Sequence, residues 1–434
     1  MTKKIRNAVD QVTINPGLLQ GQVTLPISKS LAHRIILAKA LAVATGSKMT
    51  TEATGPKVNL DSPSNSTLDL GLDLDSDLKT LNLADDIIRT IDGANELISS
   101  NSPCTIYCKD SGTTLRMIMP IACALHDQVE ITVTKELAKR PLGPLITVLE
   151  NSGCKINIKE NLDGTFTYYS HGKFQGGQCQ IPGNISSQYI SGLLYALPLT
   201  ETGGEIHLTT ELASKPYLDM TLAVLKDFGV TIHCRETNDL LVFSLLGKQK
   251  FKNTNANVNQ GDWSAAAFFA VANALGSQVE MTNLDFDSLQ GDKAIYRFID
   301  KIKINEQPVI DLEDYPDLFP VLAILASYQR KTTTFTGISR LKLKESNRIA
   351  STTAMLKVLQ GEFTVESDAK VKIQGNGSLK GGTVDSFNDH RIAMAAAIAA
   401  TKADGPVTIL DSSCCDKSYP DFFQDYGNLG GHIG

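Results

Sequence analysis

The chain has 434 residues, of which 42% are hydrophobic and 20% charged, a composition typical of a folded globular protein and not of a disordered one. It carries 41 basic and 47 acidic side chains, and the formal net charge of −6 excludes a globally basic nucleic-acid coat. At roughly 150 residues per domain, this length predicts two to three domains.

No stretch approaches the roughly 18 uninterrupted apolar residues of a membrane span. The first residues, MTKKIRNAVDQ, lack the apolar segment of a secretory signal. The eight cysteines show no CxxC spacing, and Cys414 and Cys415 are adjacent, which favours reduced thiols over a zinc site or a disulfide framework. We therefore expect a cytoplasmic protein without a metal site.

Six segments along the chain share one design. Each has a small polar cluster followed by a run rich in alanine, isoleucine, leucine and glycine, and they begin at Ser28, Asp110, Ser186, Asp262, Tyr315 and Asn388. Serine, aspartate and asparagine are good N-caps, and the nearly all-round apolarity after the first turn predicts buried helices.

A second set of six segments is amphipathic and alternates with the first; these segments begin at Ala84, Arg140, Ser214, Asp292, Lys344 and Tyr419. Short β-branched or alternating runs predict strands that start at Val129, Glu205, Leu240, Gln278 and Thr332. The pattern indicates a repeat of about 75 residues with two helices and several strands. Six such units divide most simply into two similar α/β domains of three units each.

Two units depart from this regularity. Only 53 residues separate the fourth buried segment from the fifth, against 73 to 82 elsewhere, which predicts a lost hairpin in the fourth unit. Residues 48–79 are rich in aspartate, serine, proline and glycine, and they favour an enlarged surface loop over a cation site because no ligand spacing is regular.

Basic residues gather near the starts of both sets of helices, namely Lys29, Arg34, Arg116, Arg140, Lys215, Lys344, Arg348, Arg391 and Lys417. A helix N-terminus has unpaired N–H groups and a partial positive charge, which suit an anion. An acidic protein with concentrated internal cations is expected to bind small, multiply anionic substrates.

Two short motifs bring charged side chains together. In SKSLAHR, Ser30 and Arg34 are spaced i and i+4 and share a helix face, with Lys29 near the first turn. This arrangement suits a carboxylate and a phosphate, and equally a capped, solvated helix start. The spacing of Lys344 and Arg348 also predicts a shared helix face, a pattern that alone is more often a salt-bridged surface.

Three further positions leave alternatives open. Gly112 opens a helix start where backbone N–H groups can approach an anion, but the segment lacks the lysine of a P-loop. His390 has no second histidine at metal-ligand spacing, so it is a structural residue or a polar group of an active site. Asp317 is either an N-cap or a partly desolvated general base.

Ten ordered stretches between Ser28 and Phe423 resemble the 5-enolpyruvylshikimate-3-phosphate synthase family: SKSLAHR, DSGTTLR, KRPLGPL, SSQYISGLL, SKPYLDMTL, GDWSAA, YPDLFP, LKLKESNRI, FNDHRIAM and DKSYPDFF. The resemblance implies two inside-out α/β domains, each of three βαβαββ-type repeats with buried parallel helices. One domain would comprise residues 1–20 with 258–434 and the other residues 21–257. A two-stranded hinge near 20–22 and 257–261 would join them, with the active site in the cleft between.

The resemblance also implies the reaction, in which the enolpyruvyl group of phosphoenolpyruvate passes to the 5-hydroxyl of shikimate 3-phosphate and phosphate is released. It implies no metal or organic cofactor, no nucleic-acid or membrane partner, and a monomer. Shikimate 3-phosphate would be bound by Lys29, Ser30, Arg34, Ser186, Ser187, Gln188, Ser214, Tyr217, Asp317, Arg340 and Lys344. Phosphoenolpyruvate would be bound by Lys29, Asp110, Gly112, Arg140, Gln188, Glu345, Arg348, His390, Arg391 and Lys417.

The catalytic residues implied by the resemblance are Asp317, Glu345, Lys29 and Lys344. Asp317 would remove the proton of the 5-hydroxyl and Glu345 would protonate the methylene carbon. Lys29 would stabilise the departing phosphate, and Lys344 would lie close to Asp317.

Two positions bear on the phosphoenolpyruvate side. Asp110 stands where the family commonly has asparagine, which puts that contact in doubt. Gly112 has no side chain, and we expect inhibition by glyphosate, which mimics phosphoenolpyruvate.

Two other functions remain as alternatives. The related enolpyruvyl transferase that acts on UDP-N-acetylglucosamine has a reactive cysteine on a loop, whereas residues 135–144 contain none. A non-catalytic anion-binding repeat protein is the second alternative, disfavoured by the presence of Lys29, Asp317, Lys344 and Glu345 together.

Overall fold

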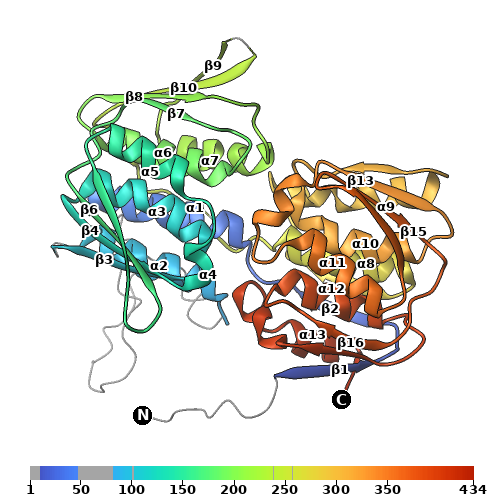
Figure 1. Cartoon of the computed structure of the whole chain (residues 1–434). Coiled ribbons are helices and arrows are strands. Elements are labelled where there is room, and N and C mark those ends of the chain that lie inside the picture. Colours follow the sequence, from blue (N-terminus) through green and yellow to red (C-terminus); the bar gives the residue numbers. More distant parts are fainter. Residues whose placement is uncertain (1–9, 47–81, 100–101, 238, 257) are drawn as a thin grey trace, which may run out of the picture.

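The computed structural model describes residues 10–46, 82–99, 102–237, 239–256 and 258–434, and these form two lobes side by side (Figure 1). Buried hydrophobic residues make two clusters, one from Ile27 to Val258 and one from Ile14 to Leu25 together with Trp263 to Leu429. We name the parts that hold them the first lobe (27–258) and the second lobe (10–25 with 261–434). The chain first passes from the second lobe to the first lobe after Leu25, a few residues beyond the expected boundary at 20, because residues 20–24 pair within the second lobe.

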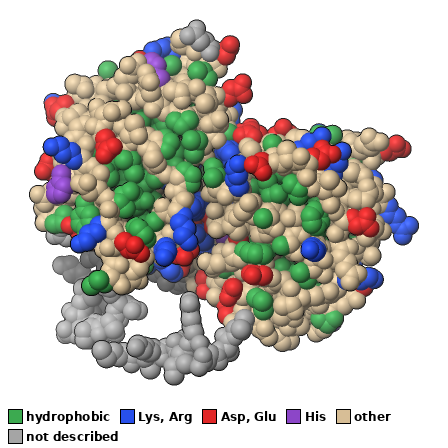
Figure 2. Space-filling model, in the orientation of Figure 1, with side chains coloured by type: hydrophobic (Ala, Val, Ile, Leu, Met, Phe, Trp, Pro, Cys, Tyr) green, Lys and Arg blue, Asp and Glu red, His purple; other side chains and the backbone are tan. Residues whose placement is uncertain are grey.

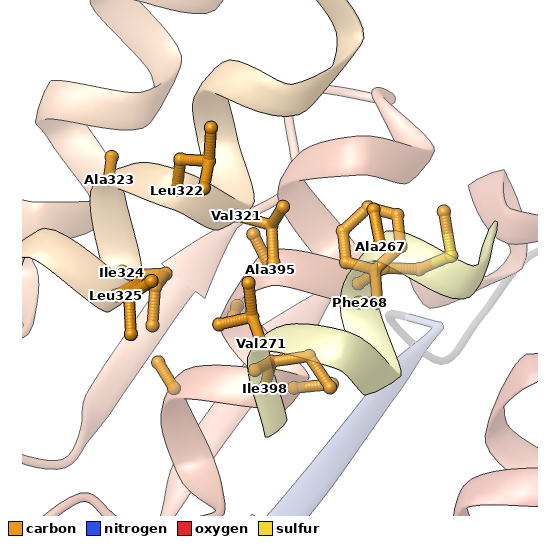
Figure 3. Packing of buried hydrophobic residues seen from close by; sticks show 14 of the residues in the cluster. Ala267, Phe268, Val271, Val321, Leu322, Ala323, Ile324, Leu325, Ala395 and Ile398 are labelled. Carbon is orange, nitrogen blue, oxygen red and sulfur yellow. The ribbon is translucent and has the colours of Figure 1, made fainter. Parts of the chain in front are cut away.

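Six helices form the centres of the lobes, and each corresponds to one predicted buried segment: α1 (Lys29–Ala44), α3 (Gly112–Leu125), α6 (Ser187–Ala196), α8 (Trp263–Leu275), α10 (Phe319–Ser327) and α12 (His390–Ala400). All nine residues of α10 and all eleven of α12 are buried. Figure 3 shows Phe268 and Val271 of α8 packed with Val321 of α10 and Ala395 and Ile398 of α12. The small alanines allow these helices to approach closely, which confirms the prediction from their all-round apolarity.

The amphipathic helices lie outside this centre: α2 (Asp85–Ile98), α5 (Gly143–Asn151), α7 (Lys215–Asp227), α9 (Ile295–Ile304), α11 (Arg348–Val358) and α13 (Phe422–Asn428). In α9, for example, only one stripe of Ile295, Phe298, Ile299 and Ile302 is buried. Short helical segments complete the set: α4 (Lys135–Ala138), η2 (Leu197–Leu199), η3 (Gly291–Ala294), η4 (Pro316–Leu318), η5 (Ser339–Leu343) and η6 (Ser412–Lys417).

The helices are covered by sheets that repeat one pairing scheme, a parallel pair followed by two antiparallel strands. In the first lobe these are β3 (Cys104–Lys109), β4 (Gln128–Val133), β6 (Phe166–His171) and β5 (Lys155–Glu160), and β7 (Gly177–Ile181), β8 (Gly203–Leu208), β10 (Leu240–Leu246) and β9 (His233–Thr237). In the second lobe they are β12 (Val309–Asp311), β13 (Thr332–Thr336), β15 (Lys370–Gln374) and β14 (Glu362–Ser367), and β16 (Gly382–Asp385), β17 (Val407–Leu410), β1 (Gln11–Asn15) and β18 (His432–Ile433). All five predicted strands are present, as β4, β8, β10, β13 and β11 (Gln278–Thr282).

The fifth sheet has two strands, β2 (Gln20–Thr24) and β11 (Gln278–Thr282), which pair in parallel. Within the described residues it lacks the antiparallel strands of the other four sheets, as the short spacing after the fourth buried segment predicts. The aspartate-rich segment 48–79 lies outside the described residues. No helix in the described part of the chain is long and apolar enough to cross a bilayer.

Candidate active site

One pocket lies where the two lobes meet, and the six buried helices all direct their N-terminal ends at it. Its walls include the first residues of α1, α3, α6, α8 and α12, and Asp317 of η4, just before α10. Figure 2 shows lysine and arginine side chains on both sides of the groove between the lobes. The predicted site residues that line the pocket are Lys29, Ser30, Arg34, Gly112, Arg140, Ser186, Ser187, Gln188, Ser214, Tyr217, Asp317, Arg340, Lys344, Glu345, Arg348, His390 and Arg391.

The sequence fixes these helix ends through capping. Five of the buried helices begin after a side chain that accepts a first-turn N–H, namely Ser28, Ser111, Ser186, Asp262 and Asp389. Capping satisfies some of the first-turn N–H groups, and the positive ends of the helix dipoles still face the pocket. The pocket is therefore electropositive from its backbone as well as from its side chains.

Asp317 is held by three cations. Its carboxylate lies 2.6 Å from Arg348 Nη1, 2.8 Å from Arg391 Nη2 and 3.6 Å from Lys344 Nζ. Burial alone would raise the pKa of Asp317, but the charges of these three side chains hold it well below its usual 3.8. Asp317 is therefore an ionised carboxylate at neutral pH.

Glu345 shares one of these cations with Asp317, because both carboxylates lie against Arg348. Its two oxygens are 2.7 Å from Arg348 Nη2 and 3.5 Å from Arg140 Nη1, the latter on the other lobe. Burial raises the pKa of Glu345, and the charges of Arg140 and Arg348 outweigh this and hold the pKa well below its usual value. The Arg140–Glu345 contact joins the two lobes directly across the pocket.

The predicted shared helix face of Lys344 and Arg348 is wrong. Helix α11 begins only at Arg348, and Lys344 follows η5 in extended backbone. The two cations nevertheless converge because both reach Asp317. Burial lowers the pKa of Lys344 to about 8, while the neighbouring Asp317 opposes the shift. A lysine with such a pKa can exchange a proton near neutral pH.

On the first lobe, Lys29 and Arg34 are tied to neighbouring elements. Lys29 Nζ lies 2.9 Å from the buried carboxylate of Asp86. Arg34 is 1% exposed, and its guanidinium donates to the backbone oxygen of Tyr217 at 2.8 Å and to Thr221 Oγ1 at 2.8 Å. Both cations are thus held at the pocket wall by contacts that fix their direction.

Gln188 and the residues of α3 form the pocket wall between these groups. Gln188 accepts a hydrogen bond from Arg116 Nη1 at 2.9 Å and donates to Thr113 Oγ1 at 2.7 Å. Gly112 faces Arg140: a Cβ there would lie 2.9 Å from Arg140 Nη1, closer than side chains normally approach. Glycine at this position therefore leaves room for the Arg140 guanidinium.

Asp110 and Lys417 are the two predicted site residues that do not line the pocket. The Asp110 carboxylate accepts a hydrogen bond from Thr134 and does not line the pocket. Lys417 Nζ donates to the backbone oxygen of Asp110 at 2.9 Å, a second bridge between the lobes. These two residues lie next to the site, and the geometry gives them a role in joining the lobes.

Several buried side-chain nitrogens in the pocket make no hydrogen bond to the described residues. They are Arg116 Nε, Arg140 Nε, Arg391 Nε and both ring nitrogens of His390. Burial and the charges of Lys29 and Arg391 lower the pKa of His390 well below 6.5, so its ring is neutral. Buried polar groups are usually satisfied, and these unpaired nitrogens therefore mark places where a polar ligand can bind.

The sequence alone did not identify two carboxylates that organise this site. Asp86, near the start of α2, is 4% exposed and pairs with Lys29, and Asp389, the N-cap of α12, is fully buried and lies 2.9 Å from Arg348 Nε. The cap pattern before α12 contains Asp389, but nothing in it indicates a distant arginine partner. Over the described residues, no group of three or more His, Cys, Asp or Glu side chains could hold a metal ion.

Comparison with known proteins shows one family throughout. The family model described as EPSP synthase (3-phosphoshikimate 1-carboxyvinyltransferase) matches residues 14–426. A 3-phosphoshikimate 1-carboxyvinyltransferase of Clostridium novyi is 36% identical over 442 residues, covering 98% of each chain. The enzyme of that name from Clostridium kluyveri is 35% identical and covers 97% of this chain and 98% of its own.

Solved structures give the same architecture. The EPSP synthase of Acinetobacter baumannii superposes with a TM-score of 0.70 at 22% identity, over 98% of this chain and 99% of that one. The enolpyruvyl transferase NikO of Streptomyces tendae gives a TM-score of 0.65 at 14% identity, with the same coverage. At such identities these structures support the two-domain enolpyruvyl transferase fold.

Proposed function

The chain belongs to the EPSP synthase family of transferases, and we propose that its pocket transfers the enolpyruvyl group of phosphoenolpyruvate to the 5-hydroxyl of shikimate 3-phosphate. The products are 5-enolpyruvylshikimate 3-phosphate and phosphate, a step of aromatic amino acid biosynthesis. The observation that carries the proposal is the convergence of Asp317, Glu345 and the pocket cations from both lobes.

The chemistry of the substrates matches the cations and polar groups that line the pocket. Each substrate carries a carboxylate and a phosphate, and arginine can bind either group through two parallel hydrogen bonds. Arg140 and Arg391 each keep an unused buried N–H, and His390 adds two neutral ring nitrogens. We assign Arg140, Arg348, Arg391, His390 and Gly112 to phosphoenolpyruvate, with Asp110 and Lys417 adjacent. We assign Ser30, Arg34, Ser186, Ser187, Gln188, Ser214, Tyr217 and Arg340 to shikimate 3-phosphate, and Lys29 to both substrates.

The reaction is an addition followed by an elimination, and it needs a base and an acid. The ionised Asp317 accepts the proton of the 5-hydroxyl as the oxygen attacks the enolpyruvyl carbon, and the ammonium of Lys344 beside it stabilises negative charge on the attacking oxygen. Glu345 must gain a proton before it can donate one to the methylene carbon. Anionic phosphoenolpyruvate placed between Arg140 and Arg348 competes for the charges that now depress the pKa of Glu345, and so favours that protonation.

In the elimination the bond between carbon and the phosphate oxygen breaks, and the methyl group returns a proton to the Glu345 carboxylate, which restores the double bond. The phosphate leaves toward Lys29, whose ammonium stabilises its charge. Closure of the two lobes excludes water from these steps. We propose that the lobes are the two domains, with boundaries near residues 20–25 and 258. Because residues of both lobes of one chain line the pocket, the proposal includes a monomer. Eight free cysteines suit a reducing compartment and favour the cytoplasm.

Phosphate release from the purified protein tests the function. With phosphoenolpyruvate and shikimate 3-phosphate we expect steady release, and none when UDP-N-acetylglucosamine replaces the shikimate substrate. Asp317→Ala should abolish turnover, whereas Asp219→Ala, which changes an exposed carboxylate outside the pocket, should not. Phosphate release only with the UDP-sugar would assign the activity of the related transferase, and no release with either acceptor would favour a binding protein.

A further inference from the structure

Helix α7 begins without a cap of its own. Its N-cap residue, Ser214, has left-handed backbone angles of φ 59° and ψ 43°, and its side chain makes no capping hydrogen bond. This conformation is sparsely populated for residues other than glycine and needs support from its surroundings. In it, the Ser214 hydroxyl accepts a hydrogen bond from Arg340 Nη2 of the second lobe at 2.9 Å.

The second lobe supplies the cap that α7 lacks. The N–H of Lys215, the first residue of α7, donates to Asp314 Oδ1 at 2.9 Å. Pro216 has no N–H, and the N–H of Tyr217 is bonded to the Ser214 carbonyl oxygen. A carboxylate at a helix N-terminus satisfies an orphan donor and complements the positive end of the dipole. Asp314 of the second lobe thus caps α7, a helix of the first lobe, across the cleft.

Two further contacts hold the same turn of α7 against the second lobe. Pro216 packs on Gly291, where an added Cβ would lie only 2.7 Å from the proline Cβ. Arg340, which contacts Ser214, is itself held by Glu313, whose Oε1 lies 3.2 Å from Arg340 Nε. Glu313 and Asp314 are adjacent, so one loop of the second lobe orients both Arg340 and the start of α7.

We propose that Asp314 is a positioning residue for the 3-phosphate of shikimate 3-phosphate. By capping α7 across the cleft, it holds Ser214 and Tyr217 in their binding geometry when the lobes are together. The inference rests on the proposed function, which assigns those two residues to the phosphate. Asp314 does not line the pocket, so its effect falls on substrate affinity and not on the reacting atoms.

Three variants separate this role from a general structural one. Asp314→Ala removes the cap, and Asp314→Asn keeps an acceptor oxygen. The control Asp219→Ala removes an exposed carboxylate that pairs with Lys215 Nζ at 2.8 Å from within α7 itself, without crossing the cleft. Three quantities are measured: hydrogen exchange of the segment containing Lys215, affinity for shikimate 3-phosphate by calorimetry, and kcat with each KM.

For Asp314→Ala we expect faster exchange at the start of α7 and about fivefold weaker binding of shikimate 3-phosphate, which is the effect of one lost cap on an equilibrium constant. The KM for shikimate 3-phosphate should rise by the same factor, with kcat and the KM for phosphoenolpyruvate within about twofold of wild type. Asp314→Asn should recover most of the affinity, and Asp219→Ala should match wild type.

Wild-type affinity in Asp314→Ala, or an equal loss in Asp219→Ala, would overturn the positioning role. Failure of the wild-type protein itself to bind shikimate 3-phosphate would instead overturn the proposed function, and the inference with it.

Discussion

Replacing Asp389 with alanine removes the fully buried carboxylate beneath the candidate active site. Asp389 Oδ2 lies 2.9 Å from Arg348 Nε and Oδ1 accepts the N–H of Arg391 at 3.0 Å as the N-cap of α12. Arg348 is 1% exposed, so its charge depends on protein carboxylates for compensation. The substitution therefore removes a helix cap and one partner of a buried arginine together.

The structure sets the magnitude of the loss. A helix cap is worth about 1 kcal/mol. Removing one partner of a buried ion pair costs roughly 3–5 kcal/mol, and the lower end applies because Arg348 keeps Asp317 and Glu345. We expect the free energy of unfolding to fall by about 4 kcal/mol in Asp389→Ala. Asp389→Asn retains a capping oxygen and should lose about half as much.

Urea denaturation followed by tryptophan fluorescence measures this loss. The single tryptophan, Trp263, is buried in the second lobe, the lobe that contains Asp389. Asp404→Ala is the matched control, because it breaks an exposed pair with Lys380 in the same lobe and should cost less than about 1 kcal/mol. Equal midpoints and slopes for Asp389→Ala and Asp404→Ala would refute the reasoning.

Three further predictions concern catalysis. Because the pKa of Lys344 is lowered to about 8, its ammonium is lost as the pH rises through that value, and kcat/KM should fall above about pH 8. The fall should move to higher pH in Lys344→Arg, and a flat wild-type profile from about pH 7 to about pH 10 would contradict this. Gly112→Ala places a methyl group against Arg140. Steady-state kinetics should show about a tenfold higher KM for phosphoenolpyruvate and weaker glyphosate inhibition, with an unchanged KM for shikimate 3-phosphate. A wild-type enzyme that millimolar glyphosate does not inhibit would refute the basis of this expectation. Asp317→Asn should lower kcat by about 10²–10⁴ with the circular dichroism spectrum retained, and near-normal turnover would exclude Asp317 as the base.

The helical framework was predictable because its signals are local. All-round apolarity after a polar cap distinguishes the α10 and α12 segments from the one-sided apolarity of α9, and burial in the structure follows that difference. The two-stranded sheet of the fourth unit was predictable from a spacing alone. The resemblance supplied the site residues, and most of them line a single pocket.

The remaining features depend on contacts that no local pattern records. Asp86 pairs with Lys29 across 57 positions of the chain, and Asp314 caps α7 across 99 positions. The i, i+4 spacing of Lys344 and Arg348 was misleading, because a helix was assumed to begin four residues before α11 does. Helix α11 begins instead after its N-cap Asn347, whose side chain accepts the N–H of Ala350. Tertiary packing sets which charge meets which, and periodicity carries no information about those partners.

The balance of charge in the pocket explains how an acidic protein can bind two anionic substrates. The lining side chains include eight lysines and arginines and four carboxylates, although the whole chain carries a net charge of −6. Arg348 is paired with three carboxylates and Lys29 with one, which offsets the cost of burying these charges in the protein itself. What a ligand meets is the remaining excess of cations. Those groups have fixed directions, so a ligand is selected by the spacing of its anionic groups more than by their number. A compound with one phosphate and no second anion would leave part of this excess unpaired, so we expect the pocket to bind inorganic phosphate more weakly than the two proposed substrates.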